Sequence, residues 1–205
     1  MGQSAGIYHP SGNTPDGQSA GLASTSKALP VFLKYIDARP DAHILDLGPV
    51  CGENINFLSR RVRKLSICDM FIRLNRQKEK GQAYERIWRH LDYDTKMFDG
   101  ILMWDLPDRL GNDAASAVGD NCRRILKPGG LVMACALDEK EDTTDIHTFV
   151  IENDLHISFR RQPHLSLPLY VRNTRKIINT MAPLKLVQSS LFRNGLREFI
   201  FRETG

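Results

Sequence analysis

The stretch Ile44-Leu45-Asp46-Leu47-Gly48-Pro49-Val50-Cys51-Gly52-Glu53-Asn54 decides how this chain is interpreted. An apolar run ends on an acid, turns through two glycines and continues into a helical pattern. Gly48 and Gly52 carry no Cβ, so the backbone can approach a ligand closely, and the helix that follows leaves free amide donors in its first turn. Asp46 adds a carboxylate at the end of the strand that can hold a cationic amine. The stretch therefore predicts a cofactor-binding loop.

A second acid, Asp69, stands at the end of the apolar run 65–70. A carboxylate there can accept hydrogen bonds from both hydroxyls of a ribose, as in dinucleotide-binding folds, where an acid follows the glycines by about 20 residues. Met70 comes next and either packs on an adenine ring or belongs to the core. A nicotinamide-dependent oxidoreductase fits poorly, because Val50 and Glu53 stand where Gly-x-Gly-x-x-Gly requires glycines.

Strand-like and helix-like patterns alternate along most of the chain. Alternation of this kind predicts an α/β fold with a doubly wound parallel sheet and helices on both faces. The end of the chain differs, because two apolar runs are joined by Arg193-Asn194-Gly195, which predicts an antiparallel hairpin. The expected elements are helices at 29–36, 54–61, 71–90 (broken by Gly81) and 113–126, strands at 43–47, 65–70, 98–104 and 131–137, a turn at 127–130, and hairpin strands at 184–192 and 196–202.

The acid and glycine loop, the second acid and the reversed hairpin together resemble the class I S-adenosylmethionine-dependent methyltransferases. The resemblance covers about residues 30–137 motif by motif and the hairpin by pattern. It implies a mostly parallel, seven-stranded sheet closed by a C-terminal antiparallel hairpin strand, with the third strand leading to residues 91–94. It also implies S-adenosylmethionine as the cofactor. Val50 is a departure, because the family commonly has a glycine at this position.

The same resemblance assigns roles to individual residues. Asp46 is expected to hold the methionine amine, Asp69 the ribose, and Asp92 the adenine amino group, although Asp92 also reads as a solvated loop acid. Trp104, at the end of the run 98–104, is expected to line the methionine portion. The complete set of predicted cofactor-binding residues is Asp46, Gly48, Pro49, Gly52, Asp69, Met70, Leu91, Asp92 and Trp104.

No catalytic residue is identified from the sequence. His147, His156 and His164 fall between residues 138 and 183, a variable segment that the resemblance does not cover. Each could act as a general base or be an ordinary surface histidine. The four cysteines lack CxxC spacing, so free thiols and no metal site are expected.

Length and composition set the remaining expectations. The chain has 205 residues, of which 41% are hydrophobic, enough for one domain over residues 27–205. Residues 1–26, rich in Gly, Ser and Thr, are expected to form a flexible arm that, with residues 138–170, covers the carboxyl ends of the strands. No apolar run could span a membrane and no secretory signal is visible, which predicts a cytoplasmic protein.

The expected function is transfer of a methyl group to a small-molecule acceptor. Residues 156–205 contain nine basic and two acidic residues, which leaves nucleic acid open as a partner but does not favour it. The alternative is a catalytically degenerate S-adenosylmethionine-binding protein with a regulatory or partner-binding role. The acceptor and the oligomeric state cannot be read from the sequence.

Overall fold

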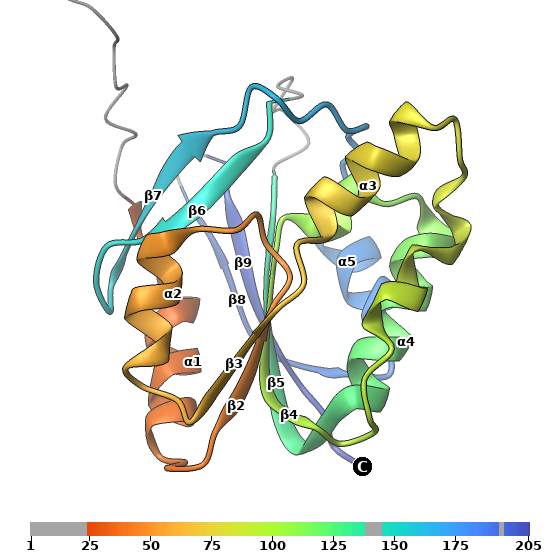
Figure 1. Cartoon of the computed structure of the whole chain (residues 1–205). Helices are drawn as coiled ribbons and strands as arrows, with labels where there is room; N and C mark the ends of the chain where they lie inside the picture. The colour runs from red at the N-terminus through yellow and green to blue at the C-terminus, as the bar shows by residue number, and fades with distance from the viewer. Residues whose placement is uncertain (1–23, 138–144, 193–194) are drawn as a thin grey trace, which may run out of the picture.

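A six-stranded, mostly parallel sheet forms the centre of the fold in the computed structural model, which describes residues 24–137, 145–192 and 195–205 (Figure 1). The strand order is β3-β2-β4-β5-β9-β8. Only β9 runs against its neighbours, because it pairs antiparallel with both β5 and β8. The strands are β2 (His43–Asp46), β3 (Lys64–Ile67), β4 (Phe98–Trp104), β5 (Leu126–Ala136), β8 (Lys185–Leu191) and β9 (Arg197–Arg202).

Helices cover both faces of this sheet, as predicted. The elements are α1 (Ala28–Asp37) and α2 (Gly52–Ser59) on one face, and α3 (Met70–Glu79), α4 (Asn112–Ile125) and α5 (Thr174–Thr180) on the other (Figure 1). Two short 3-10 helices, η1 (Tyr84–Leu91) and η2 (Leu106–Arg109), precede and follow β4. Each face has its own apolar core. In the described part of the chain, no helix is long and apolar enough to cross a membrane.

The periodicity of the sequence explains these two cores. β4 is buried along its whole length, as expected for a strand covered on both faces. In α1 the buried side chains Leu29, Phe32, Leu33 and Ile36 recur at helical spacing and face the sheet. The predicted doubly wound α/β arrangement is therefore confirmed.

A second, smaller sheet lies beside the carboxyl end of β2 and above α2 (Figure 1). It consists of β6 (His147–Ile151), β7 (His156–Arg161) and the short β1 (Ser24–Thr25), all antiparallel in the order β1-β7-β6. Ser24 and Thr25, which were predicted to belong to the flexible arm, are thus part of a sheet. Residues 1–23 and 138–144 of the predicted arm and variable segment lie outside the described residues.

The prediction of seven strands is wrong by one. The segment expected to contain the third strand forms the 3-10 helix η1, followed by residues 92–97 without a strand. Ile87 and Leu91 are both fully buried, and the partly buried Tyr84 and Trp88 pack against the same core, so this segment contributes to the core as a helix. The predicted helix 71–90 is consequently two elements, separated where Gly81 adopts φ 62°.

One further boundary differs from prediction. Residues 127–130, expected to be a turn, belong to β5, which already pairs with Phe98 through Leu126. In place of the expected turn, the pairing of β4 with β5 has a register shift between Phe98 and Gly100, and Gly129 adopts φ 78°. At the end of the chain β8 and β9 pair antiparallel as expected. Residues 193–194 of the predicted turn lie outside the described residues.

Candidate cofactor site

The glycine loop joins β2 to α2 and is held by an acid on each side. Asp46 Oδ1 accepts a hydrogen bond from the backbone N–H of Gly48 at 2.9 Å. Asp69 Oδ2 accepts one from the backbone N–H of Val50 at 3.1 Å. The fold therefore brings the two predicted acids to the same loop, at the carboxyl edge where open α/β sheets bind ligands.

The indole of Trp104 lies directly against Gly48. Its Nε1–H donates to Asp46 Oδ1 at 2.8 Å. A Cβ added to Gly48 would stand 2.4 Å from Trp104 Cδ1, so glycine is required here to make room for the protein's own indole. Trp104 adopts φ 52°, a left-handed conformation that bulky residues rarely take. Packing of the ring thus overrides a backbone preference.

The carboxyl group of Asp46 is enclosed by this arrangement. Burial raises its pKa to about 6, while the hydrogen bonds from Gly48 and Trp104 oppose the shift by favouring the ionised form. Asp46 is therefore mainly ionised at pH 7 and becomes protonated on mild acidification. An ionised carboxylate in this position can hold a cationic group, provided that the group can reach it past the indole.

A cluster of three aromatic rings covers Asp46 and the indole that bonds to it. Phe149 on β6 stacks on Trp104 with ring centroids 5.4 Å apart and an interplanar angle of 21°. Phe159 on β7 meets Phe149 edge to face at 5.2 Å. The β6–β7 hairpin therefore forms a roof over the corner that Asp46, Gly48 and Trp104 make.

Asn54 fixes this roof to the first turns of α2. Its Nδ2 donates to the carbonyl of Phe149 at 2.8 Å, and its Oδ1 accepts from the N–H of Ile151 at 2.8 Å. Asn54 is buried, so both backbone groups of β6 depend on this one side chain. An exposed ion pair between Glu53 and Arg160, at 2.6 Å, joins the same two elements and holds the pKa of Glu53 down to about 2.

Asp69 has a structural role at the other end of the loop. Besides its bond to Val50, its Oδ1 accepts from the N–H of Ile72 at 2.9 Å and caps the N-terminus of α3. Two exposed apolar side chains lie around it, Val50 on the loop and Ile67 at the end of β3. A Cβ on Gly52 would meet no atom within 4 Å, so the start of α2 is open to a ligand.

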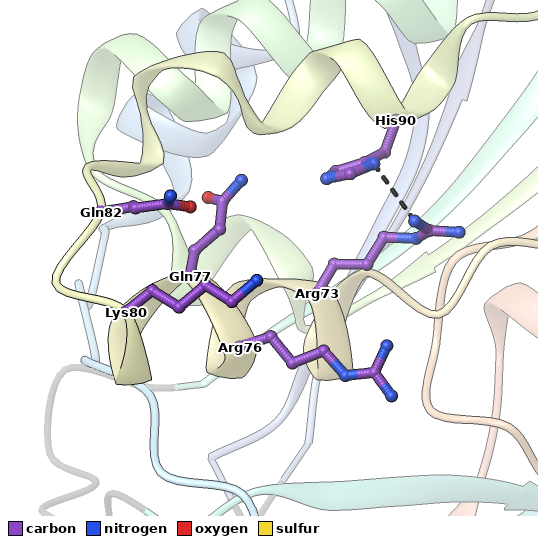
Figure 2. A pocket seen from close by; sticks show the side chains of 6 residues that line it. All are labelled: Arg73, Arg76, Gln77, Lys80, Gln82 and His90. Carbon is purple, nitrogen blue, oxygen red and sulfur yellow. Dashed lines mark hydrogen bonds between the residues drawn. The ribbon is translucent and has the colours of Figure 1, made fainter.

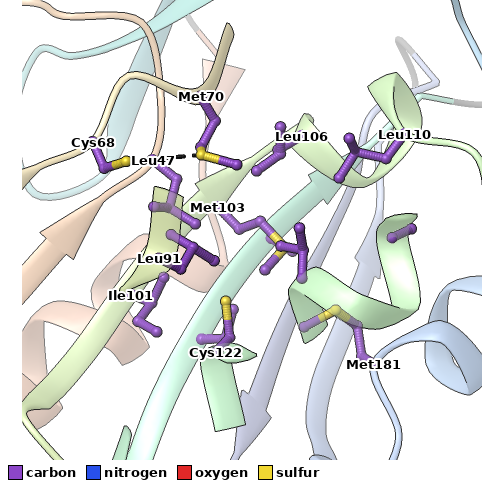
Figure 3. Packing of buried hydrophobic residues seen from close by; sticks show 14 of the residues in the cluster. Leu47, Cys68, Met70, Leu91, Ile101, Met103, Leu106, Leu110, Cys122 and Met181 are labelled. Carbon is purple, nitrogen blue, oxygen red and sulfur yellow. Dashed lines mark hydrogen bonds between the residues drawn. The ribbon is translucent and has the colours of Figure 1, made fainter. Parts of the chain in front are cut away.

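Three predicted site residues lie away from the loop surface. Met70 and Leu91 are fully buried and point into the apolar core (Figure 3). Asp92 is exposed but lines a cavity of about 260 Å³ together with Asn121 and Arg124 of α4. This cavity lies against the carboxyl-terminal turn of α4, which leads into the amino end of β5, whereas the glycine loop follows the carboxyl end of β2.

A buried network of charged side chains supports the end of β4 behind Trp104. Asp105 and Arg109 form an ion pair at 3.0 Å with both side chains almost inaccessible. Asp108 accepts from the N–H of Leu137 at 2.7 Å, and burial raises its pKa to about 7. Arg172 donates to the carbonyls at the ends of η2, which ties the segment before α5 to this platform.

Two of the three histidines considered as general bases lie at opposite ends of the β6–β7 hairpin. His147, at the start of β6, is close enough for its charge to influence the pKa of the buried Asp105. His156 bonds through Nδ1 to Asn153 Oδ1 at 2.9 Å, at the opposite end of the hairpin. His164 is exposed and follows β7 at the same end as His147, where the N–H of Gln162 donates to the carbonyl of Ile146. His147 thus lies at the end of the hairpin nearest the β4 platform.

Sequence reasoning missed Asn54 and Phe149, which build the roof. Neither residue belongs to a motif: a single asparagine in a helix and a phenylalanine in an apolar run carry no signal of long-range contact. The described residues contain no group of three or more His, Cys, Asp or Glu side chains able to hold a metal ion.

No protein-family model matches the sequence, and no curated protein matches it either. Solved structures match its fold. A S-adenosylmethionine-dependent methyltransferase from Clostridium acetobutylicum is 12% identical with a TM-score of 0.58, covering 85% of this chain and 91% of that one. The N-methyltransferase NodS from Bradyrhizobium japonicum, in complex with S-adenosyl-L-homocysteine, is 16% identical with a TM-score of 0.51, covering 87% and 85%.

A further solved structure with this fold is described as a cyclase. SpnF is 11% identical with a TM-score of 0.53, and the match covers 87% of this chain and 80% of SpnF. At such identities the similarity establishes the fold alone. The chain therefore has the class I S-adenosylmethionine-dependent methyltransferase fold, as the resemblance implied.

Proposed function

We propose that this chain binds S-adenosylmethionine at the glycine loop and transfers its methyl group to a small-molecule acceptor. The observation that carries the proposal is the loop itself, held between Asp46 and Asp69 at the carboxyl edge of a methyltransferase-like sheet. The bound cofactor would supply an electrophilic methyl group on a sulfonium. The protein's part would be to bind, orient and exclude water, since near-attack positioning supplies much of the catalysis in such transfers.

The residues that would hold the cofactor are fewer than the sequence suggested. Asp46 would accept the amine, the backbone from Gly48 through Pro49 to Gly52 would face the cofactor, and Asp69 would accept the ribose hydroxyls. Asp69 can do this while capping α3, because a carboxylate has about four lone-pair sites and two are in use. Met70 and Leu91 are buried and Asp92 lines a separate cavity against α4, so these three residues have no part in the proposal.

With the side chains in their present positions, the site has room for the adenosine half of S-adenosylmethionine but not for its methionine half. Gly52 borders open space, whereas the surface of Gly48 is covered by the Trp104 indole. Binding of the whole cofactor therefore requires the indole to turn away from Asp46. A rotation about the side-chain torsions of Trp104 would uncover Gly48, at the cost of the hydrogen bond from Nε1 to Asp46 and of the stacking on Phe149.

Calorimetric titration with S-adenosylhomocysteine tests this proposal. We expect micromolar binding, about 7–8 kcal/mol, in the wild type and tighter binding in Trp104→Ala, because the variant removes the side chain that must move. Asp69→Asn, which retains an N-cap, should weaken binding by about 1.5–3 kcal/mol. Absence of binding in both the wild type and Trp104→Ala would overturn the proposal.

A second candidate function is favoured by the closed corner. If the stack of Trp104, Phe149 and Phe159 is permanent, the fold would serve a regulatory or partner-binding role without methyl transfer. The cyclase SpnF illustrates that this fold is not restricted to proteins named as methyltransferases. Binding of S-adenosylhomocysteine by the wild type, with no methyl transfer from S-adenosylmethionine to any acceptor supplied, would favour this candidate, a catalytically degenerate S-adenosylmethionine-binding protein.

The acceptor side of the site is proposed to be the variable segment 138–183. The β6–β7 hairpin covers the carboxyl edge, and His147 lies at its end nearest the β4 platform. Together with the amino-terminal arm, this segment would exclude water from the reacting groups. Removing residues 1–23 should alter turnover or cofactor release while leaving the melting temperature nearly unchanged.

A further inference from the structure

A cationic groove separate from the glycine loop lies between α3 and η1. It has a volume of about 240 Å³ and is lined by Arg73, Arg76, Gln77, Lys80, Gln82 and His90. Figure 2 shows the side chains of α3 rising on one side and His90 descending from the other. The volume lies below the roughly 300–1,000 Å³ typical of drug-sized ligands, so a compact molecule fits best.

Among the side chains that the structure describes, no acid forms an ion pair with the cations of this groove. The acid of the same helix, Glu79, instead accepts a hydrogen bond from Asn75 Nδ2 at 2.8 Å. Three cationic side chains, Arg73, Arg76 and Lys80, therefore border one groove, and none of them is paired with a described acid.

His90 contributes a directed donor to the groove. Its Nδ1 lies 3.2 Å from Arg73 Nη1. Arginine can only donate, so Nδ1 accepts and the ring proton resides on Nε2. Burial and the Arg73 charge lower the pKa of His90, which keeps the ring neutral. In Figure 2 the opposite ring nitrogen is turned toward Gln77, across the middle of the groove.

The amide of Gln77 adds an unused acceptor. Its Oε1 is buried and has no hydrogen-bond partner among the described residues. A buried unpaired acceptor costs free energy unless a donor reaches it, and a hydroxyl of a bound ligand could supply that donor. The groove thus offers cations and an N–H donor for an anion, with amides beside them for hydroxyl groups.

We propose that this groove binds the phosphate group of a small, hydroxyl-bearing phosphate monoester. Arg76 and Lys80 would hold the phosphate, because charge-assisted hydrogen bonds to phosphate are stronger than neutral ones. Gln77 and Gln82 would contact the hydroxyl groups. This inference is independent of the proposed methyl transfer, since it uses none of the residues of the glycine loop.

In the test, ribose 5-phosphate is added to the full-length protein at constant ionic strength, and the NMR chemical shifts of the backbone amides are recorded. We expect shifts in residues 73–90 with a Kd on the order of 0.1–1 mM. Inorganic phosphate should shift the same residues more weakly, and ribose alone should not bind. A uridine oligonucleotide serves as the macromolecular comparison.

Two neighbouring lysines provide the matched variants. Lys80 lines the groove, whereas Lys78 is bonded to Ser166 Oγ at 2.7 Å, outside it. Arg76→Gln combined with Lys80→Gln should weaken the binding of ribose 5-phosphate at least about 10-fold, and Lys78→Gln should change it less than about 2-fold. The single variant Lys80→Gln, expected to weaken binding about 3-fold or more, carries the test if the double variant unfolds.

Several outcomes would overturn the inference. Equal losses in Lys78→Gln and Lys80→Gln would mean a diffuse surface charge rather than a site. Unchanged binding in the double variant would place the phosphate elsewhere. Much tighter binding of the oligonucleotide than of ribose 5-phosphate, lost in the double variant, would make the groove a nucleic-acid contact and refute the small ligand.

Discussion

The closed corner around Trp104 and the cationic groove between α3 and η1 use charged side chains in opposite ways. In the corner, Asp46 is enclosed and its hydrogen bonds come from the protein itself. In the groove, Arg76 and Lys80 are exposed and no described acid pairs with them. A buried charged group is satisfied by hydrogen-bond and ion-pair partners within the protein, whereas an exposed charged group remains available to a ligand.

The largest effect is expected in the corner, where packing dominates. Trp104→Ala should lower the free energy of unfolding by about 3–5 kcal/mol, because a fully buried aromatic side chain is removed. Trp104→Gly should be more stable than Trp104→Ala by about 1 kcal/mol, since glycine tolerates the left-handed backbone. Urea denaturation measures both. In the groove, Arg76→Gln should stay within about 0.5 kcal/mol of the wild type.

A second effect tests the attachment of the roof. Asn54→Ala should cost about 2–4 kcal/mol, because the carbonyl of Phe149 and the N–H of Ile151 lose their partner while buried. Hydrogen exchange should accelerate in β6 before it does in the central sheet. The exposed neighbour Asn56 is the control, and Asn56→Ala should leave β6 protected. Equal protection of β6 in both variants would mean that Asn54 does not hold the hairpin.

A third effect concerns pH and again separates the corner from an exposed site. The pKa of Asp46 is about 6 in the folded chain against 3.8 for an ordinary aspartate, so the protonated form favours folding. This stabilisation is fully present below about pH 4 and is lost as the pH rises through 6. Relative to Asp46→Asn, the wild type should gain on the order of 1–3 kcal/mol between pH 7 and pH 4.

The measurement is the pH dependence of urea denaturation in both proteins. Asparagine can accept the same two hydrogen bonds, so the comparison isolates the ionisation of Asp46. The exposed Asp41, paired with Arg63 at 2.9 Å, is the control, and Asp41→Asn should leave the slope of the wild type unchanged. Parallel curves for Asp46→Asn and the wild type would contradict the prediction.

The smallest effect belongs to the half-buried acid between the two regions. Asp69→Ala should cost about 1 kcal/mol, the usual loss for removing an N-cap, whereas Asp69→Asn should be nearly neutral because asparagine also caps helices. Thermal denaturation ranks the two variants. If Asp69→Ala is as stable as Asp69→Asn, the capping of α3 by Asp69 does not contribute to stability.

Much of the fold was predictable because its signals are local. The continuous apolar run of β4 and the helical spacing of α1 each identify an element without knowledge of its neighbours. The reversed hairpin at the end of the chain was predicted from turn chemistry. The absence of the third strand was not predicted, because that strand was implied by the family resemblance, whereas the helical pattern of residues 84–90 is what the structure retains as η1.

In the candidate site, the glycine loop and the two acids that meet it could be predicted from the sequence, because these residues lie at strand ends whose order in the sheet follows from alternation. The contacts that these residues make could not be predicted. Gly48 faces the indole of Trp104, and Asp69 caps α3. These contacts join segments far apart in sequence, such as Asn54 and β6, and their geometry is set by packing of the whole core rather than by any local pattern.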